Sequence, residues 1–231
     1  MDTIDNNTFG FCLSKLKNFD KPIILELGVD KGGSTAKFLK FINDNGGELY
    51  SIDIKDCSNV VNNENFKNVD TKKWNFLKTN DLNIEHIFEK FPKIKDGVDV
   101  LYIDSYHDET HVKKTLEKWF IYVKKNGYIF FDDTESLFYK KLKNFSLSVN
   151  NDAIDKFVKK FFYNNSHQIS YTKYFKGSGL SEFNKLSKLG SKPIFTNNVW
   201  EYNFIIARIY LTVKKILYIV KSKDKKDSNI Q

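Results

Sequence analysis

Three aspartates follow two apolar segments that have the length and composition of buried strands. Asp104 ends the run 98–104, and Asp132 and Asp133 directly follow the run 127–131. Neighbouring parallel strands end at one edge of a sheet, so we expect these carboxylates to converge. Crowded carboxylates repel one another unless a cation joins them, and their oxygens suit Mg²⁺ or Mn²⁺. The sequence therefore predicts a divalent-metal site, and the alternative is that the aspartate pair caps the following helix.

A histidine lies close enough to the first of these aspartates to act on the same bound molecule. His107 follows Asp104 in the loop after the predicted strand. The ordinary pKa of an imidazole, about 6.5, suits a general base, so His107 is the candidate for removing a proton. A surface or capping histidine is the alternative. His111 is a weaker candidate on the same helical face, and we interpret His86 and His167 as structural.

A glycine-rich segment lies between the first predicted strand and the helix that follows it. This segment, residues 26–34, has the sequence ELGVDKGGS. Glycine in such a turn lets a ligand approach the backbone, and the start of the helix favours an anionic group. The spacing matches neither GxGxxG nor the P-loop pattern GxxxxGK[ST]. A plain structural turn is the alternative.

Asp53 ends the next predicted strand and adds a second feature to the glycine turn. A carboxylate at this place can accept both hydroxyls of a ribose, although a turn or helix-capping role is the alternative. Together the two features predict a ligand that contains a nucleoside, either a nicotinamide cofactor or S-adenosylmethionine. Glu26 favours S-adenosylmethionine, because a carboxylate beside the turn would repel a pyrophosphate but could hold a sulfonium or amino group.

The elements that must position these residues indicate an α/β domain. Short apolar runs alternate with amphipathic segments, the pattern of a mainly parallel sheet covered by helices. The predicted strands are 22–27, 48–53, 74–78, 98–104 and 127–131, with a terminal antiparallel hairpin over 168–175 and 180–183. The predicted helices are 34–43, 84–91, 109–124 and 153–162. A composition with 16% aromatic residues, 11 Gly and 3 Pro excludes disordered and collagen-like chains.

Four segments in this order resemble the class I S-adenosylmethionine-dependent methyltransferases. They are ILELGVDKGGS, LYSID, VLYIDSYHDETHVKKTLEKW and GYIFFDDTE. Within that class the segments are most similar to the macrocin O-methyltransferase-like and cephalosporin hydroxylase-like proteins. The resemblance covers about residues 21–134. It implies a Rossmann-like, mostly parallel seven-stranded sheet with helices on both faces and an antiparallel terminal hairpin.

The resemblance also implies a role for each matching residue. The methionine end of S-adenosylmethionine would be held by Glu26, Gly28, Gly32 and Ser34. The ribose would be held by Asp53 and the adenine by Asn80 and Asp81. Asp104 would serve the cofactor and the reaction, and it would bind a divalent metal together with Asp132 and Asp133.

These roles lead us to expect a metal-assisted O-methyltransferase, with Mg²⁺ or Mn²⁺ on the acceptor hydroxyl and His107 as the base. By family analogy the acceptor is a hydroxyl of a sugar, glycan, nucleotide-sugar or related small molecule. The strand ending at Asp104 continues Ser-Tyr-His, which lacks the [N/D]PP[Y/F] pattern of enzymes that methylate base amines. An RNA-directed methyltransferase and a non-catalytic Rossmann-like binding module are the alternatives. The glycine spacing disfavours a nicotinamide dehydrogenase.

We expect three parts in the chain. They are a methyltransferase domain over 1–195, an amphipathic helical appendage over 196–221 and a disordered basic tail over 222–231. Most of the net charge of +8 comes from seven basic and two acidic residues from Arg208 onward, and a chain with one Arg disfavours nucleic-acid binding.

The appendage is expected to pack on its own domain or on a second subunit, as in a homodimer. Weak contact with a membrane surface is the alternative, which would make the protein peripheral to the inner membrane face. Two cysteines without metal-ligand spacing, and no secretory signal at the start, lead us to expect a cytoplasmic protein.

Overall fold

The computed structural model describes residues 8–134, 149–175, 178–196 and 212–214. Contacts within the chain separate two units, residues 1–195 and 196–231. Of the second unit only residues 196 and 212–214 are described, so nearly all of the predicted appendage and all of the predicted tail lie outside the described residues. Across the described ranges, no helix combines the length and the apolar character that crossing a membrane requires.

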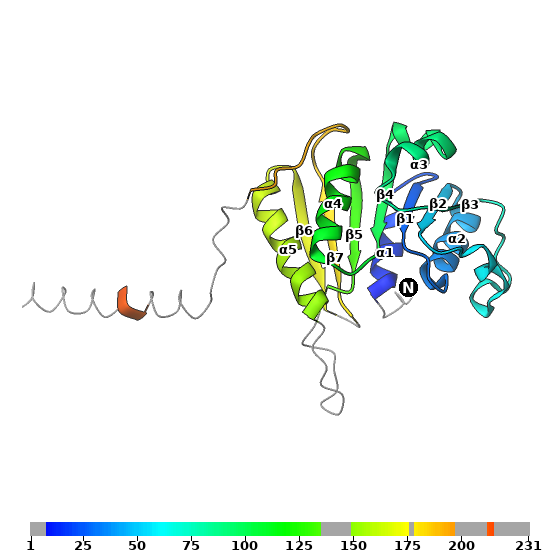
Figure 1. Ribbon diagram of the computed structural model, residues 1–231, viewed down its shortest axis with the longest axis horizontal. Coiled ribbons are helices and arrows are strands. Elements are labelled where there is room, and N and C mark those ends of the chain that lie inside the picture. The colour runs from blue at the N-terminus through cyan, green and yellow to red at the C-terminus, as the bar shows by residue number, and fades with distance from the viewer. Residues whose placement is uncertain (1–7, 135–148, 176–177, 197–211, 215–231) are drawn as a thin grey trace, which may run out of the picture. The chain divides into compact units, whose positions relative to one another are not determined.

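Seven strands form one sheet in the order β3-β2-β1-β4-β5-β7-β6, which can be followed in Figure 1 from right to left. The strands are β1 (Ile23–Leu27), β2 (Glu48–Asp53), β3 (Trp74–Lys78), β4 (Val98–Ile103), β5 (Val123–Asp132), β6 (Ile169–Tyr174) and β7 (Leu180–Lys185). The first five strands pair in parallel, and β7 runs antiparallel between β5 and β6. The predicted fold class, a mostly parallel sheet with a terminal antiparallel hairpin, is confirmed.

Helices cover the two faces of this sheet. The α-helices are α1 (Thr8–Leu16), α2 (Gly33–Asn45), α3 (Ile84–Lys90), α4 (Glu109–Trp119) and α5 (Val149–Asn165). The 3₁₀ helices are η1 (Ser58–Asn62), η2 (Glu64–Phe66), η3 (Pro92–Asp96) and η4 (Phe120–Tyr122).

Two apolar clusters join the helices to the sheet. One packs α3, α4 and α5 against strand residues such as Leu25 and Leu101, and the other packs α1 and α2 against Ile24 and Val100. Adjacent residues of a strand point to opposite faces, so both faces of β1 and β4 are buried. This explains the unbroken apolar runs in the sequence.

The predicted helix 109–124 is too long. The helix α4 ends at Trp119, and Val123 already pairs with Val98 as the first residue of β5. Phe120 and Val123 are fully buried in these positions, so their apolar character fits a helix and a strand equally well. The sequence prediction also lacked α1, whose short apolar stripe follows a polar start.

The pairing register brings the carboxyl ends of the central strands to one edge of the sheet. Leu27 at the end of β1 pairs with Ile52 of β2 and with Ile103 of β4. Ile103 in turn pairs with Phe131 of β5. The polar residues that directly follow these positions therefore share one edge, where ligands bind in open α/β sheets.

Candidate functional site

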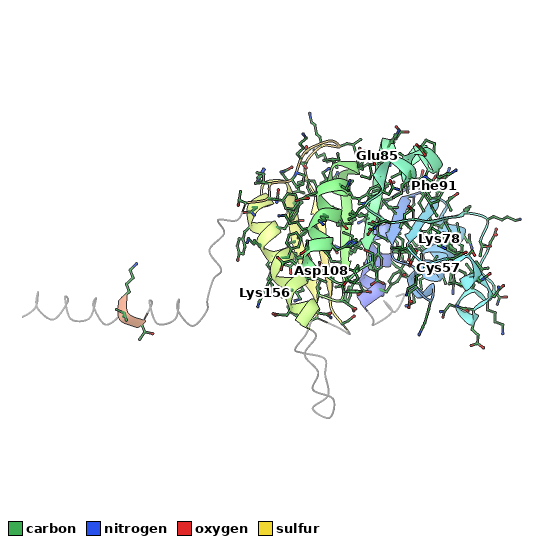
Figure 2. All side chains as sticks on the ribbon, in the orientation of Figure 1. Cys57, Lys78, Glu85, Phe91, Asp108 and Lys156 are labelled. Atoms are coloured by element: carbon green, nitrogen blue, oxygen red, sulfur yellow. The ribbon has the colours of Figure 1, made fainter. Side chains whose placement is uncertain are left out.

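A cavity of about 570 Å³ opens at this edge of the sheet. Seven residues that the sequence singled out line it: Gly28, Asp53, Asn80, Asp81, Asp104, His107 and His111. The volume lies within the usual range for a small-molecule site. Lys78 ends β3, Cys57 follows β2 and Asp108 follows β4, so these three residues, labelled in Figure 2, lie near the edge of the sheet where the strands end.

Gly28 allows the ends of β1 and β4 to meet. Its φ of 98° lies in the left-handed region, and a Cβ at this position would lie 2.2 Å from the carbonyl oxygen of Asp104. The amide of Asp104 donates to the carbonyl of Leu27 at 2.8 Å, which holds the two strand ends together. Only glycine fits this close approach without displacing the backbone.

Asp53 holds the turn between β1 and α2. Its Oδ2 accepts from the amides of Val29 at 2.8 Å and Asp30 at 3.2 Å, and its Oδ1 accepts from the amide of Lys55 at 2.8 Å. Burial acts to raise the pKa of Asp53, but these backbone donors together lower it below its ordinary value. The thiol of Cys57 donates to the same carboxylate, and the role predicted for Asp53 toward the ribose stays a prediction.

Glu26 lies behind the cavity wall and does not line it. The carboxylate is fully buried and accepts from the hydroxyls of Ser34, Thr35 and Ser51. Burial raises the pKa of Glu26 to about 7, against the opposing effect of the three hydroxyl donors. Neither Ser34 nor Gly32 lines the cavity. The roles predicted for these three residues toward the methionine end stay predictions.

Gly32 instead packs against a side chain from η2. Its φ is 73°, and a Cβ there would lie 2.7 Å from the ring of Phe66. The glycine at this place lets the 3₁₀ segment lie close to the start of α2.

His107 lies between two of the three predicted metal-binding carboxylates. Its Nε2 is 3.3 Å from Asp104 Oδ1, and its Nδ1 is 3.7 Å from Asp133 Oδ2. The hydrogen bond with Asp104 is the main cause that raises the pKa of His107. Burial raises the pKa of Asp104. The histidine therefore lies between two acids at the wall of the cavity. Carboxylates in these positions can stabilise the imidazolium that forms when a histidine acts as a base.

Asp132 points to a different partner. Its Oδ2 accepts from the hydroxyl of Tyr102 at 2.8 Å, and its Oδ1 accepts from the amide of Asp133 at 2.9 Å. Burial, followed by the charges of Asp104 and Asp133, raises the pKa of Asp132 to about 6. Its side chain lines a small recess next to the main cavity, together with His107.

These residues do not fit a preformed metal site as they are arranged. Among the described residues, no three acidic, cysteine or histidine side chains are grouped as ligands of one ion. His107 lies between Asp104 and Asp133, where a cation shared by these two carboxylates would sit.

His111, the weaker candidate for the base, contacts another acid of the cavity wall. Its Nε2 lies 2.9 Å from Asp81 Oδ2. The hydroxyl of Ser105, a residue that sequence reasoning did not select, donates to the same oxygen at 2.8 Å. The position of Ser105 directly after Asp104 was the one available signal.

The sequence profile of a family described as methyltransferase domain matches residues 25–134. This range contains every predicted site residue and the strands β2, β3, β4 and β5. The matched range covers slightly less than half of the chain, and the strand order is that of the Rossmann-like fold shared with solved methyltransferase structures. No curated protein sequence matches the chain.

Solved structures share the fold at low sequence identity. MycE, a methyltransferase from the mycinamycin biosynthetic pathway in complex with Mg and SAH, is 15% identical with a TM-score of 0.54, over 81% of this chain and 51% of MycE. The chain thus spans about half the length of MycE.

Two further structures match over most of both chains. A Staphylococcus aureus protein with the provisional description caffeoyl-CoA O-methyltransferase is 17% identical with a TM-score of 0.57, over 77% of this chain and 82% of its own. An rRNA methylase from Streptococcus thermophilus is 11% identical with a TM-score of 0.55, over 80% of this chain and 100% of its own. Relatives so distant show the fold, and their acceptors differ.

Proposed function

We propose that the chain is an S-adenosylmethionine-dependent O-methyltransferase. The observation that carries the proposal is the position of His107, held between Asp104 and Asp133 in the wall of a cavity that also contains Asp53 and Asp81. One cavity thus offers carboxylates for a nucleoside and a base for an acceptor. The SAH in the MycE complex and the methyltransferase profile support the cofactor.

The chain's own residues provide binding, alignment and proton removal. S-adenosylmethionine, when bound, supplies an electrophilic methyl group. Asp53 binds the ribose hydroxyls, and Asp104 lies at the strand end nearest Gly28, where the reacting end of the cofactor is expected. His107 directs its Nε2–H at Asp104 and accepts the proton of the acceptor hydroxyl at Nδ1, and the carboxylates of Asp104 and Asp133 stabilise the imidazolium that results.

The proposal also includes the class of acceptor and the assistance of a divalent metal ion. A hydroxyl of a sugar, glycan, nucleotide-sugar or related small molecule is supported by the resemblance of residues 21–134 to the macrocin O-methyltransferase-like proteins. The Mg in the MycE complex supports assistance by Mg²⁺ or Mn²⁺. In this chain such an ion would require His107 to leave its place between Asp104 and Asp133.

The test is methyl transfer from labelled S-adenosylmethionine to a panel of sugar, nucleotide-sugar and phenolic hydroxyls, with RNA as a further acceptor. Each reaction is run with EDTA, and with excess Mg²⁺ or Mn²⁺. Transfer to a hydroxyl supports the proposal, and its loss in EDTA with recovery in Mg²⁺ supports metal assistance. Full activity in EDTA would show that no metal ion takes part in the reaction.

Two outcomes would replace the proposal. Binding of S-adenosylmethionine without transfer to any acceptor would favour a non-catalytic binding module. Methylation of RNA alone, with steep dependence on salt, would favour an RNA-directed enzyme.

A further inference from the structure

The carboxylate of Asp81 is held from one side only. Its Oδ2 accepts from Ser105 Oγ at 2.8 Å and lies 2.9 Å from His111 Nε2. An ionised carboxylate only accepts, so we assign the proton to Nε2. The second oxygen, Oδ1, accepts from none of the residues that the structure describes. Because the Asp81 side chain is 7% exposed and lines the cavity, Oδ1 is the oxygen left for a ligand.

One of the two donors, His111, is fixed at the start of α4. Asp108 caps this helix by accepting from the amide of His111 at 3.0 Å. The ring of Tyr106 meets the imidazole edge-on, with centroids 5.9 Å apart. The orientation of His111 is therefore set by its own helix and by the loop after β4, independently of Asp81.

The main chain of Asp81 is fixed by the same helix. Trp119 is fully buried in α4, and its Nε1 donates to the carbonyl of Asp81 at 2.8 Å. Side chain and backbone of Asp81, which follows β3, are thus both held by the segment 105–119. Three contacts from one segment hold this residue, which indicates that the direction of its side chain matters.

The set of Ser105, His111 and Asp81 is not arranged for nucleophilic catalysis. In a catalytic triad the serine donates to the histidine, and the histidine donates from its other nitrogen to the acid. Here Ser105 donates to Asp81, and the same nitrogen of His111 faces both partners, at 3.3 Å from Ser105 Oγ. The arrangement instead concentrates two donors on one carboxylate oxygen.

We infer that Ser105 and His111 are positioning residues that fix Asp81 so that its free oxygen selects a purine that carries an exocyclic amine. The exocyclic amine of adenine donates to this oxygen, whereas the carbonyl that replaces the amine in hypoxanthine would face it with a lone pair. A site built around a hydrogen bond discriminates strongly against a ligand that lacks the matching group. This inference rests on the proposed function, because it concerns the adenine of the same cofactor.

The test compares binding of S-adenosylhomocysteine and of its deaminated analogue, S-inosylhomocysteine, to the purified full chain by calorimetry. The wild type is expected to bind the adenosyl compound roughly 10- to 100-fold more tightly. In His111→Ala and in Ser105→Ala the ratio is expected to fall, to about threefold or less for His111→Ala. His111→Gln, which retains a side-chain N–H donor, is expected to keep most of the ratio.

His86→Ala is the matched control, because His86 is a surface histidine of α3 that contacts Glu89. It should keep the wild-type ratio. A histidine that only stabilised the fold would change both affinities equally and leave the ratio intact. If His111→Ala does not fold, Ser105→Ala decides.

Two results separate the possible failures. Wild-type ratios in both folded variants would overturn the inference and leave the proposed function in place. Failure of the wild type to bind S-adenosylhomocysteine would overturn the proposed function, and this inference with it.

Discussion

The edge of the sheet around the cavity has two sides that use carboxylates in different ways. At the ends of β1 and β2, Glu26 accepts from three hydroxyls and Asp53 from three backbone amides. At the ends of β4 and β5, three aspartates lie near one another with His107 between two of them. The first side satisfies each charge with donors, and the second side crowds charges around a base.

This difference separates binding from chemistry. Hydrogen-bonded carboxylates with fixed surroundings keep the shape of a ligand site before the ligand arrives, which lowers the cost of binding. Crowded acids beside an imidazole shift pKa values, as is typical of catalytic groups. We therefore expect variants of the first side to change stability and cofactor affinity, and variants of the second side to change turnover.

The largest effect is expected at the base. His107→Ala should lower methyl transfer by about 10²–10⁴-fold, the usual contribution of a positioned base. Its affinity for S-adenosylhomocysteine should stay within about threefold of the wild type, because Asp53 and Asp81 are intact. Turnover and calorimetry on one preparation check both numbers, with His86→Ala as the control. Unchanged turnover would show that His107 is not the base of the reaction.

Gly28→Ala should destabilise the fold by about 3 kcal/mol, because the new Cβ would meet the carbonyl of Asp104 at a positive φ. Gly33→Ala is the matched control. Gly33 is the first residue of α2, and a Cβ there would meet no atom within 4 Å. The control should be neutral or slightly stabilising. Urea unfolding measures both free energies, and equal effects of the two variants would contradict the close approach of β1 and β4.

Glu26 makes the first side sensitive to pH. Its pKa in the folded chain is about 7, raised from 4.5, so the folded state keeps a proton that the unfolded state loses. The stabilising contribution is complete below about pH 4.5 and is lost as the pH rises to 7, by about 3 kcal/mol in total.

Glu26→Gln cannot titrate and should lack this decline. The free energy of unfolding of both proteins, measured in urea from pH 4.5 to 8, gives the difference directly. Parallel curves for the wild type and the variant would show that Glu26 is not buried as a proton-holding acid.

The smallest of these effects is expected at the ribose. Asp53→Ala should weaken binding of S-adenosylhomocysteine by about 1.5–3 kcal/mol, the contribution of a hydrogen bond to a charged group. Asp56→Ala, which changes a nearby exposed aspartate, should leave the affinity unchanged. Calorimetry that shows equal affinities for Asp53→Ala and the wild type would place the ribose elsewhere.

The sequence predicted the sheet and the cavity residues for a clear reason. Each of Gly28, Asp53, Asp104 and His107 lies at or just after the end of an apolar strand, and parallel strands end at one edge. This rule needs no knowledge of side-chain packing. The rule therefore placed the candidate site at one edge of the sheet.

Features that depend on side-chain packing could not be predicted from the sequence. The end of α4 was placed too late, because Phe120 is buried whether the chain is helical or not. The hydroxyls of Thr35 and Ser51 donate to the buried carboxylate of Glu26, and no spacing rule shows which face of α2 and β2 they occupy. Ser105 and His111 meet Asp81 only because two loops adjoin in space.

The most direct test of the account is the product of one reaction with S-adenosylmethionine labelled with carbon-13 in its methyl group. The wild type and His107→Ala are each incubated with the hydroxyl acceptors, and the new methyl resonance is recorded by NMR. The account predicts an O-methyl signal with the wild type and its near loss in the variant. A wild-type signal from a nitrogen- or carbon-bound methyl group, or equal O-methyl signals from both proteins, would contradict it.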